Sequence, residues 1–198
     1  MSTKLLLIRH GQTPWNIKKR YCGTRNIGLS IEGKKQAKLL AQRLKDELIH
    51  RVYASDKKRA IQTAKIIFKG TKINQVPDLK EMHFGVFEGL TCQEVMKKYP
   101  GIYKKWISNP FSVTIPQGES LADFRKRVAR ALRKIALANK NKTIAIVCHG
   151  GTISAFITMI LKSKDFWKHI PQPASLSIVE YKDGRAKIKL ANDTAHLI

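Results

Sequence analysis

The sequence has few cysteines, few acidic residues and no long apolar segment. Its three cysteines, Cys22, Cys92 and Cys148, are widely separated, so they give neither a disulfide framework nor a zinc-binding spacing. Such sparse thiols are typical of a reducing compartment. No apolar run approaches the roughly 20 residues that a membrane-spanning helix needs. We therefore expect a protein that has no disulfides, binds no metal through its cysteines and does not span a membrane.

The N-terminal segment lacks the long apolar core of a signal peptide. Only residues 5–8 form an apolar run before Arg9, whereas a signal peptide has a core of roughly 7 to 15 apolar residues. We therefore expect a cytoplasmic protein. Hydrophobic residues make up 43% of the 198 residues, which is enough for a sizeable core. The length favours a single domain over residues 1–198.

Acidic residues are scarce beside the basic ones. There are 14 Asp and Glu against 38 Lys and Arg, which gives a formal net charge of +24. Such a charge attracts anions, including phosphorylated metabolites, nucleic acid and acidic lipids. The basic residues are spread along the whole chain, without a dense block or interleaved aromatic residues. We therefore favour a solvated basic surface and do not expect nucleic-acid binding.

Apolar periodicity predicts short buried strands that alternate with helices. The predicted strands cover residues 4–9, 51–54, 73–76 and 143–147. The predicted helices cover residues 31–48, 57–69, 121–135 and 151–161. Residues 175–181 and 186–190 flank Asp183-Gly184, a strong hairpin signal. This order predicts a three-layer α/β/α fold with a mostly parallel central sheet and an antiparallel edge.

Two predicted helices carry expectations about single residues. In the first, Leu48 continues the apolar face, after Ser30 at the N-cap. In the third, Ser120 and Asp123 have the spacing of a capping box. The basic residues of that helix are expected to form a solvated face: Arg125, Lys126, Arg127, Arg130, Arg133 and Lys134.

The stretch over residues 78–118 is less regular than the rest of the chain. It contains Pro100, Pro110 and Pro116, several glycines and two short helical patterns, near residues 93–98 and 102–107. We expect a loop-rich insertion that covers a site.

Two predicted strands end in a histidine followed by glycine, at His10-Gly11 and at His149-Gly150. Ligands of open α/β sheets bind beyond the carboxyl ends of the strands, so both imidazoles are placed for function. Gly11 permits a sharp turn and a close approach to a ligand. Arg9 adds a cation whose fork of donors suits phosphate oxygens.

Four segments resemble, in order and spacing, the motifs of the histidine phosphatase (phosphoglycerate-mutase-like) superfamily. They are residues 7–16 (LIRHGQTPWN), 55–64 (SDKKRAIQTA), 79–89 (LKEMHFGVFEG) and 147–151 (VCHGG). Residues 117–120 (QGES) and 192–197 (NDTAHL) extend the resemblance over essentially the whole chain. Within the superfamily the chain resembles α-ribazole phosphatases and metal-independent phosphoserine phosphatases.

The resemblance implies a phosphatase that works through a phosphohistidine. His10 is then the nucleophile, and Arg9, Arg59 and His149 surround the transferring phosphoryl group. Glu81 is the general acid and later the base, which requires a raised pKa.

The resemblance also suggests how the substrate is held. Asn16 and the backbone amide of Gly150 are expected phosphate donors. Cys22 stands where related phosphatases often carry Gln, and is an expected substrate contact. We expect no metal and no other cofactor, because no carboxylate cluster suits magnesium.

Two alternatives to a phosphatase remain. A phosphoglycerate mutase would form the same phosphohistidine, although the compact stretch between Glu81 and His149 favours the phosphatase. A non-enzymatic nucleic-acid-binding or scaffold protein would be supported by the charge alone. The expected substrate is a small phosphomonoester, with α-ribazole phosphate, phosphoserine and broad specificity as candidates. The predicted hairpin offers an edge for a homodimer.

Overall fold

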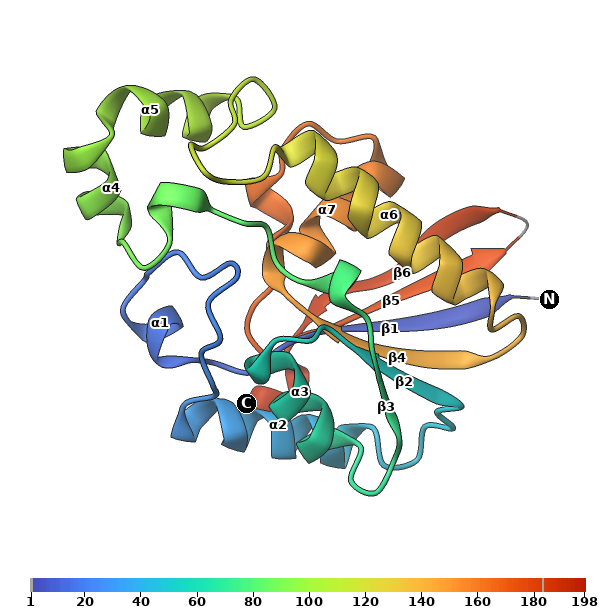
Figure 1. Cartoon of the computed structure of the whole chain (residues 1–198). Helices are drawn as coiled ribbons and strands as arrows, with labels where there is room; N and C mark the ends of the chain where they lie inside the picture. Colours follow the sequence, from blue (N-terminus) through green and yellow to red (C-terminus); the bar gives the residue numbers. More distant parts are fainter. Residues whose placement is uncertain (1, 183) are drawn as a thin grey trace.

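A mixed β-sheet forms the middle layer of the computed structural model, which describes residues 2–182 and 184–198 (Figure 1). Within these residues, its strands are β1 (Thr3–Arg9), β2 (Arg51–Ala54), β3 (Ile73–Gln75), β4 (Thr143–Cys148), β5 (Leu176–Lys182) and β6 (Arg185–Asp193). Their order is β3-β2-β4-β1-β5-β6. The first four of these strands are mutually parallel, and β5 runs antiparallel to both β1 and β6. The predicted mostly parallel sheet with an antiparallel edge is confirmed.

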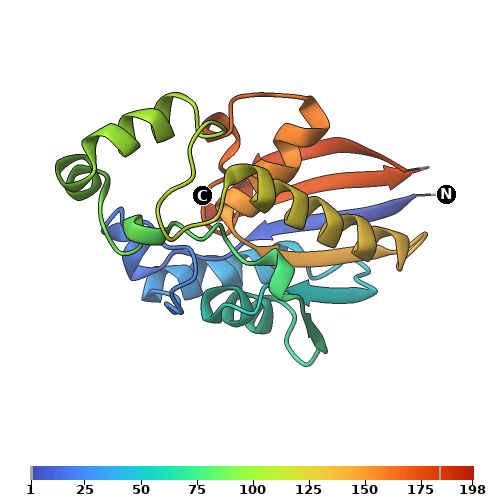
Figure 2. The same ribbon diagram turned by 45° about the horizontal axis from the view of Figure 1, so that its top comes forward.

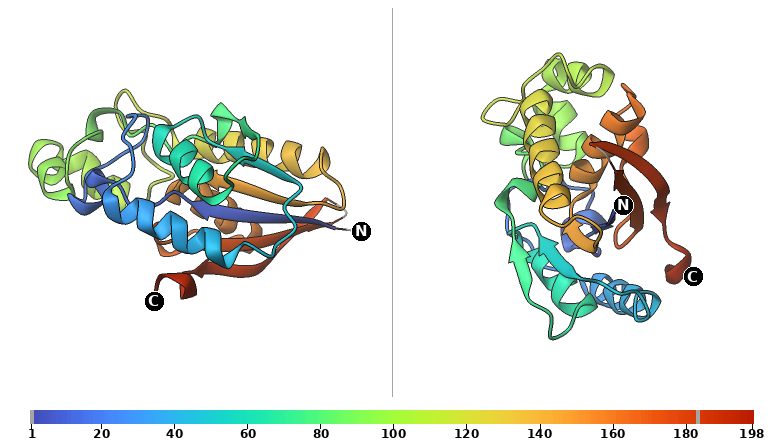
Figure 3. Two further views of the ribbon diagram at one scale, coloured as in Figure 1. Left: turned by 90° about the horizontal axis from the view of Figure 1, so that it is seen from below. Right: turned by 90° about the vertical axis from the view of Figure 1, so that its right-hand side faces the viewer.

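Helices cover both faces of the sheet, as Figures 2 and 3 show. One face carries α2 (Ile31–Arg43) and α3 (Lys58–Ile67), and the other carries α6 (Leu121–Leu137) and α7 (Gly150–Leu161). The remaining helical elements are α1 (Pro14–Ile17), α4 (Cys92–Lys98), α5 (Pro100–Ser108) and the 3-10 turns η1 (Pro77–Leu79), η2 (Gly85–Phe87), η3 (Trp167–His169) and η4 (Ala195–Leu197). The three-layer architecture is therefore the predicted one.

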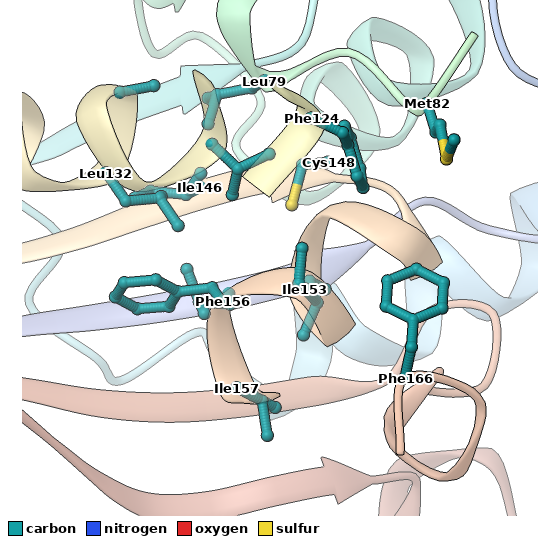
Figure 4. Packing of buried hydrophobic residues seen from close by; sticks show 14 of the residues in the cluster. Leu79, Met82, Phe124, Leu132, Ile146, Cys148, Ile153, Phe156, Ile157 and Phe166 are labelled. Atoms are coloured by element: carbon teal, nitrogen blue, oxygen red, sulfur yellow. The ribbon is translucent and has the colours of Figure 1, made fainter. Parts of the chain in front are cut away.

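Alternate residues of the central strands face opposite layers, because side chains of a strand point to its two faces in turn. In β1, Leu6 and Ile8 pack toward α2 and α3, whereas Leu5 and Leu7 pack toward α6 and α7. Figure 4 shows the face of the sheet that α6 and α7 cover, where side chains of β4, α6 and α7 pack together. They include Phe124, Leu132, Ile146, Cys148, Ile153 and Phe156. Both faces of β1 and β4 are buried, which fixes the position of whatever follows these strands.

The expectation that Leu48 lies on a buried helix face is wrong. Helix α2 begins as predicted, with Ser30 Oγ accepting from Gly33 N at 3.0 Å. It ends at Arg43, and the following residues turn out of the helix. The helical period no longer applies there, so Leu48 is 73% exposed.

Two expectations for α6 need correction. Ser120 Oγ accepts from Asp123 N at 3.0 Å, but Asp123 returns a contact to that hydroxyl and not to the backbone. The capping box is therefore only half formed. Arg127 is not part of the solvated face, because its side chain is only 11% exposed and pairs with Glu119. Arg125 is half-buried and lies over the Phe111 ring.

The antiparallel edge consists of β5 and β6, as predicted. Gly184 in the connecting turn has a left-handed φ of +76°, whereas Asp183 lies outside the described residues. Strand β6 forms one edge of the sheet, and its use in a homodimer stays a prediction. None of the helices in the described parts of the chain is long and apolar enough to span a bilayer.

The expected insertion contains η1, η2, α4 and α5, which confirms the two short helical patterns. Figure 1 shows α4 and α5 beyond the carboxyl ends of the parallel strands. Trp106 of α5 is fully buried and packs edge-to-face on Trp167 of η3, with ring centroids 5.2 Å apart. The insertion is thus attached to the segment that follows α7, across the end of the sheet.

Candidate active site

His10 and His149 are neighbours because their strands are neighbours. Strands β1 and β4 pair in parallel, with Arg9 beside Cys148 at the last register position. His10 N then donates to Cys148 O at 3.0 Å. The two imidazole centroids lie 5.2 Å apart. The predicted strand ends thus meet at one point.

Arg59, from the first turns of α3, lies between the two imidazoles. Its Nε is 3.2 Å from His10 Nε2 and 3.2 Å from His149 Nδ1. The remaining guanidinium nitrogens donate to three backbone carbonyls of the loop after α1, those of Cys22, Gly23 and Arg25. Arg59 is only 1% exposed, so solvent competes little for these hydrogen bonds, which connect both histidines to the loop.

Hydrogen bonds define which ring nitrogens carry a hydrogen. His10 Nδ1 lies 2.8 Å from Gly11 O, and a carbonyl only accepts, so Nδ1 carries the hydrogen and Nε2 keeps its lone pair. His149 Nδ1 faces the Arg59 donor, and its Nε2 lies 2.8 Å from Ser55 Oγ. The neutral His149 ring therefore carries its hydrogen on Nε2, toward Ser55.

Both imidazoles are buried and surrounded by cations. Burial, followed by the charges of Arg59 and Arg9, holds the pKa of His10 well below 6.5. Burial and the charge of Arg59 also lower the pKa of His149. Both rings are therefore neutral near pH 7. His10 Nε2 then carries a lone pair, which accepts from Arg59 Nε in this structure and is able to attack an electrophile.

Glu81 lies in the loop between η1 and η2, opposite the histidines. Its carboxyl is 7% exposed and accepts from two backbone amides, Met82 N at 2.9 Å and Gly151 N at 2.8 Å. Burial raises the pKa of Glu81, and the two amides together with the nearby arginines oppose that rise only in part. The raised pKa is what a carboxyl group needs in order to donate a proton.

Arg9 supplies cationic donors beside His10 and Glu81. Its guanidinium donates to Pro171 O, and within the described part of the chain its buried Nε has no hydrogen-bond partner. Burial lowers the pKa of Arg9 to about 10, so the group stays charged at neutral pH. A buried N–H donor without an acceptor is costly, which favours the binding of an anion at this point.

A cavity of about 180 Å³ opens onto these groups. It is lined by Arg9, His10, Asn16, Arg20, Tyr21, Cys22, Glu81, Phe84, Gly150, Gly151, Phe166, Trp167 and Ile170. Six of the eight residues proposed from sequence line it. The other two, Arg59 and His149, do not line it, and Arg59 Nε contacts both imidazoles.

Asn16 and Cys22 line the same cavity. The Asn16 side chain accepts from Thr13 N at 2.9 Å and closes a capping box at the start of α1, which fixes its direction. Cys22 is half-buried, and burial raises the pKa of its thiol. The thiol is therefore a neutral wall of the cavity.

Sequence reasoning missed Ser55 and most of the apolar wall. Ser55 directly follows β2, so the strand-end rule that selected His10 and His149 would also have selected it. Phe84, Phe166 and Trp167 come from segments without a periodic pattern, and no signal in the sequence marks them. Within the described ranges, no three His, Cys, Asp or Glu side chains form a group that could hold a metal ion.

Comparison with known proteins gives a consistent family. The model of the histidine phosphatase superfamily (branch 1) matches residues 5–194. The metal-independent phosphoserine phosphatase of Arabidopsis thaliana is 36% identical over 200 residues, covering 98% of this chain and 83% of that protein.

Solved structures agree with this assignment. A phosphoserine phosphatase mutant from Entamoeba histolytica, in complex with phosphoserine, has a TM-score of 0.91 and 31% identity, covering 99% of this chain and all of that one. The α-ribazole phosphatase of Shigella flexneri has a TM-score of 0.87 and 27% identity, covering 97% of each chain. The predicted resemblance is confirmed: the chain belongs to the histidine phosphatase superfamily.

Proposed function

We propose that this protein hydrolyses small phosphomonoesters through a phosphohistidine formed at His10. One observation carries the proposal: a neutral imidazole with an unprotonated Nε2 and a carboxyl of raised pKa line the same small cavity. Arg9 and Arg59 add positive charge beside that imidazole. A phosphoryl group needs a nucleophile, an acid and cations of this kind.

In the first step, the lone pair of His10 Nε2 attacks phosphorus while the bond to the leaving oxygen breaks. Glu81 gives its proton to that oxygen, so the product leaves as a neutral alcohol. The hydrogen bond from Nδ1 to Gly11 O orients the ring and stabilises the positive charge that develops on it. Arg9 donates to the equatorial oxygens, and Arg59 adds positive charge beside them. His149 contacts Arg59 Nε and helps to keep that side chain in place. Asn16 and the Gly150 amide add further donors.

In the second step, Glu81 is a carboxylate and accepts a proton from water. The resulting hydroxide attacks phosphorus, the P–N bond breaks, and its electron pair returns to His10 Nε2. Inorganic phosphate leaves, and both catalytic groups are restored to their starting protonation states. The double role of Glu81 explains why its carboxyl must be buried yet still reached by the solvent that enters the cavity.

We propose that the reaction needs no metal. Arg9 and Arg59 provide the positive charge that a divalent cation would otherwise supply to the phosphoryl oxygens. The Arabidopsis relative is named a metal-independent phosphoserine phosphatase, which supports this proposal. Phosphoserine and α-ribazole phosphate are the substrates to test first, because related proteins are named for them.

The test is phosphate release from phosphoserine, α-ribazole phosphate and 4-nitrophenyl phosphate, with EDTA present. Wild type is expected to turn over at least one of these and to form an acid-labile phosphoprotein, and His10→Ala is expected to do neither. Turnover that survives His10→Ala would refute the phosphohistidine. Activity abolished by EDTA and restored by a divalent cation would refute metal independence.

The same assay with 3-phosphoglycerate as substrate addresses the mutase alternative. A mutase would interconvert 3-phosphoglycerate and 2-phosphoglycerate without releasing phosphate, whereas the proposed phosphatase releases phosphate because water reaches the phosphohistidine. Interconversion without release would therefore replace the proposed function by a phosphoglycerate mutase.

A further inference from the structure

Glu81 is carried by a loop, in contrast to the strand-borne histidines. Its carboxyl is held by Met82 N and Gly151 N, but the loop backbone has no strand partner over residues 80–84. General acid catalysis depends on placing the proton donor within hydrogen-bond reach of the leaving oxygen. Some other contact must therefore hold this backbone in place.

The side chain of Arg127, on α6, makes that contact. Its Nη1 donates to Asp78 O at 2.7 Å and Lys80 O at 3.0 Å, and its Nη2 lies 3.5 Å from Glu81 O. These carbonyls belong to the turn that leads into Glu81 and to Glu81 itself. One rigid, planar group thus holds the backbone on the N-terminal side of the carboxyl.

Glu119 holds Arg127 in turn and also holds the other side of the loop. Its carboxylate accepts from Arg127 Nε at 3.0 Å and from Nη2 at 2.7 Å. Its backbone N donates to His83 O at 2.9 Å, two residues after Glu81. The side chains of Arg127 and Glu119 are only 11% and 19% exposed, so solvent competes little for this bidentate pair.

We infer that Arg127, fixed by Glu119, is a positioning residue that holds Glu81 at the distance needed for proton transfer. This inference rests on the proposed function. Arg127 does not line the cavity, so it does not touch the substrate. The charges that act on Glu81 are those of Arg59 and Arg9, so Arg127 acts through geometry. Thr152 Oγ1 of α7 adds a weaker contact to Leu79 O, at 3.3 Å.

The test uses the dependence of kcat/KM on the leaving group. A 4-nitrophenolate leaves with little help from an acid, whereas an alkoxide needs the proton of Glu81. A displaced Glu81 should therefore lower kcat/KM for alkyl phosphates and leave that for 4-nitrophenyl phosphate nearly unchanged. Loss of folding or of the His10 site should lower kcat/KM for both. The quantity kcat/KM reports the phosphorylation step, in which the leaving oxygen departs.

Arg127→Met is expected to lower kcat/KM for an alkyl phosphate by roughly 10- to 100-fold and for 4-nitrophenyl phosphate by less than about 3-fold. Arg133→Met, the same change at an exposed position of α6, is expected to alter neither. In the double variant Glu81→Gln/Arg127→Met, kcat/KM for the alkyl phosphate should be no lower than in Glu81→Gln, because both changes act through the Glu81 carboxyl group.

An equal fall for both substrates, no fall, or an additive double variant would overturn the inference while leaving the proposed function intact. An inactive wild type would overturn the proposed function first, and this inference with it. If Arg127→Met does not fold, Arg127→Lys and Glu119→Gln apply the same test. Arg127→Lys removes the fork of donors, and Glu119→Gln removes the charge that holds Arg127, so each should give the same selective loss at smaller size.

Discussion

The two halves of the catalytic cavity are built differently. The phosphoryl half consists of His10, Arg59 and His149, which follow buried parallel strands or begin a helix packed on them. The acid half consists of Glu81, in a loop whose backbone is held by side chains from α6 and α7. Position in the first half is therefore set by the sheet, and in the second by a few tertiary contacts.

The difference separates the two demands of the reaction. The phosphoryl group is the same in every substrate, so the residues that stabilise it can be part of the rigid core. The leaving group differs between substrates, and we expect it to face the aromatic wall that Phe84, Phe166 and Trp167 form in the cavity. A loop held by side chains can change between relatives without disturbing the sheet.

The largest expected effect is in the phosphoryl half, at Arg59. Arg59→Lys keeps a charge but not the fork that reaches two imidazoles and three carbonyls, so kcat/KM should fall about 1,000-fold. The fall should be the same for alkyl and 4-nitrophenyl phosphates, because both transfer the same phosphoryl group. Lys65→Met, at an exposed position of α3, is the control. A loss confined to alkyl phosphates would break the distinction between the halves.

The next effect is in the acid half. Glu81→Gln removes the transferable proton while it keeps the size of the side chain, so kcat/KM for an alkyl phosphate should fall about 100- to 1,000-fold. For 4-nitrophenyl phosphate the fall in kcat/KM should be under about 10-fold. Rapid mixing should show a burst of nitrophenol, because the same carboxylate is needed to activate water in the second step. A uniform loss in kcat/KM without a burst would contradict this assignment.

A smaller effect is expected at Ser55, which contacts His149 Nε2 at 2.8 Å. Ser55→Ala removes the acceptor of the Nε2 hydrogen and frees the ring to change its tautomer and direction, so kcat/KM should fall roughly 10-fold for all substrates. Ser108→Ala, at an exposed position of α5, is the control. A loss that depends on the leaving group would place Ser55 with the acid half.

The same contrast explains how much the sequence could predict. His10 and His149 were predictable from two short apolar runs that each end in His-Gly, because a buried strand leaves little freedom for the residue after it. Glu81 was predicted only by resemblance to a family, since nothing in its own segment has a period. Arg127 binds the backbone that leads into Glu81, and helical periodicity placed that arginine among the solvated basic residues of α6.

Two further features lie beyond any reading of local pattern. The carbonyls that Arg59 binds come from an irregular loop, whose path is set by Glu88 and by contacts with the insertion. The aromatic wall joins η2 to the segment after α7, more than 80 residues apart in sequence by the numbers of Phe84 and Trp167. Neither contact has a sequence signature, because both depend on where distant loops meet.

The smallest expected effect concerns stability, and it has opposite signs in the two halves. The pKa of His149 is lowered by burial and by Arg59 from its usual 6.5. The unfolded chain therefore takes up that proton more readily, so stability is fully present above pH 6.5 and is lost as the pH falls. The pKa of Glu81 is raised from its usual 4.5, so its contribution is present below pH 4.5 and is lost as the pH rises through the folded-state value.

Chemical denaturation at pH 7.5 and pH 5.5 measures this contrast. Between pH 7.5 and pH 5.5, the free energy of unfolding of wild type should fall by about 1 kcal/mol more than that of His149→Asn. The variant lacks the imidazole that the folded wild-type protein keeps neutral. Ser108→Ala, an exposed change that alters no titratable group, should leave the wild-type difference in place. Glu81→Gln should shift the difference in the opposite direction, toward a larger loss in acid, because it removes the group that favours the folded state at low pH. If both variants shift the difference in the same direction, the two halves share one electrostatic environment, and the division drawn between the sheet-borne and the loop-borne groups does not hold.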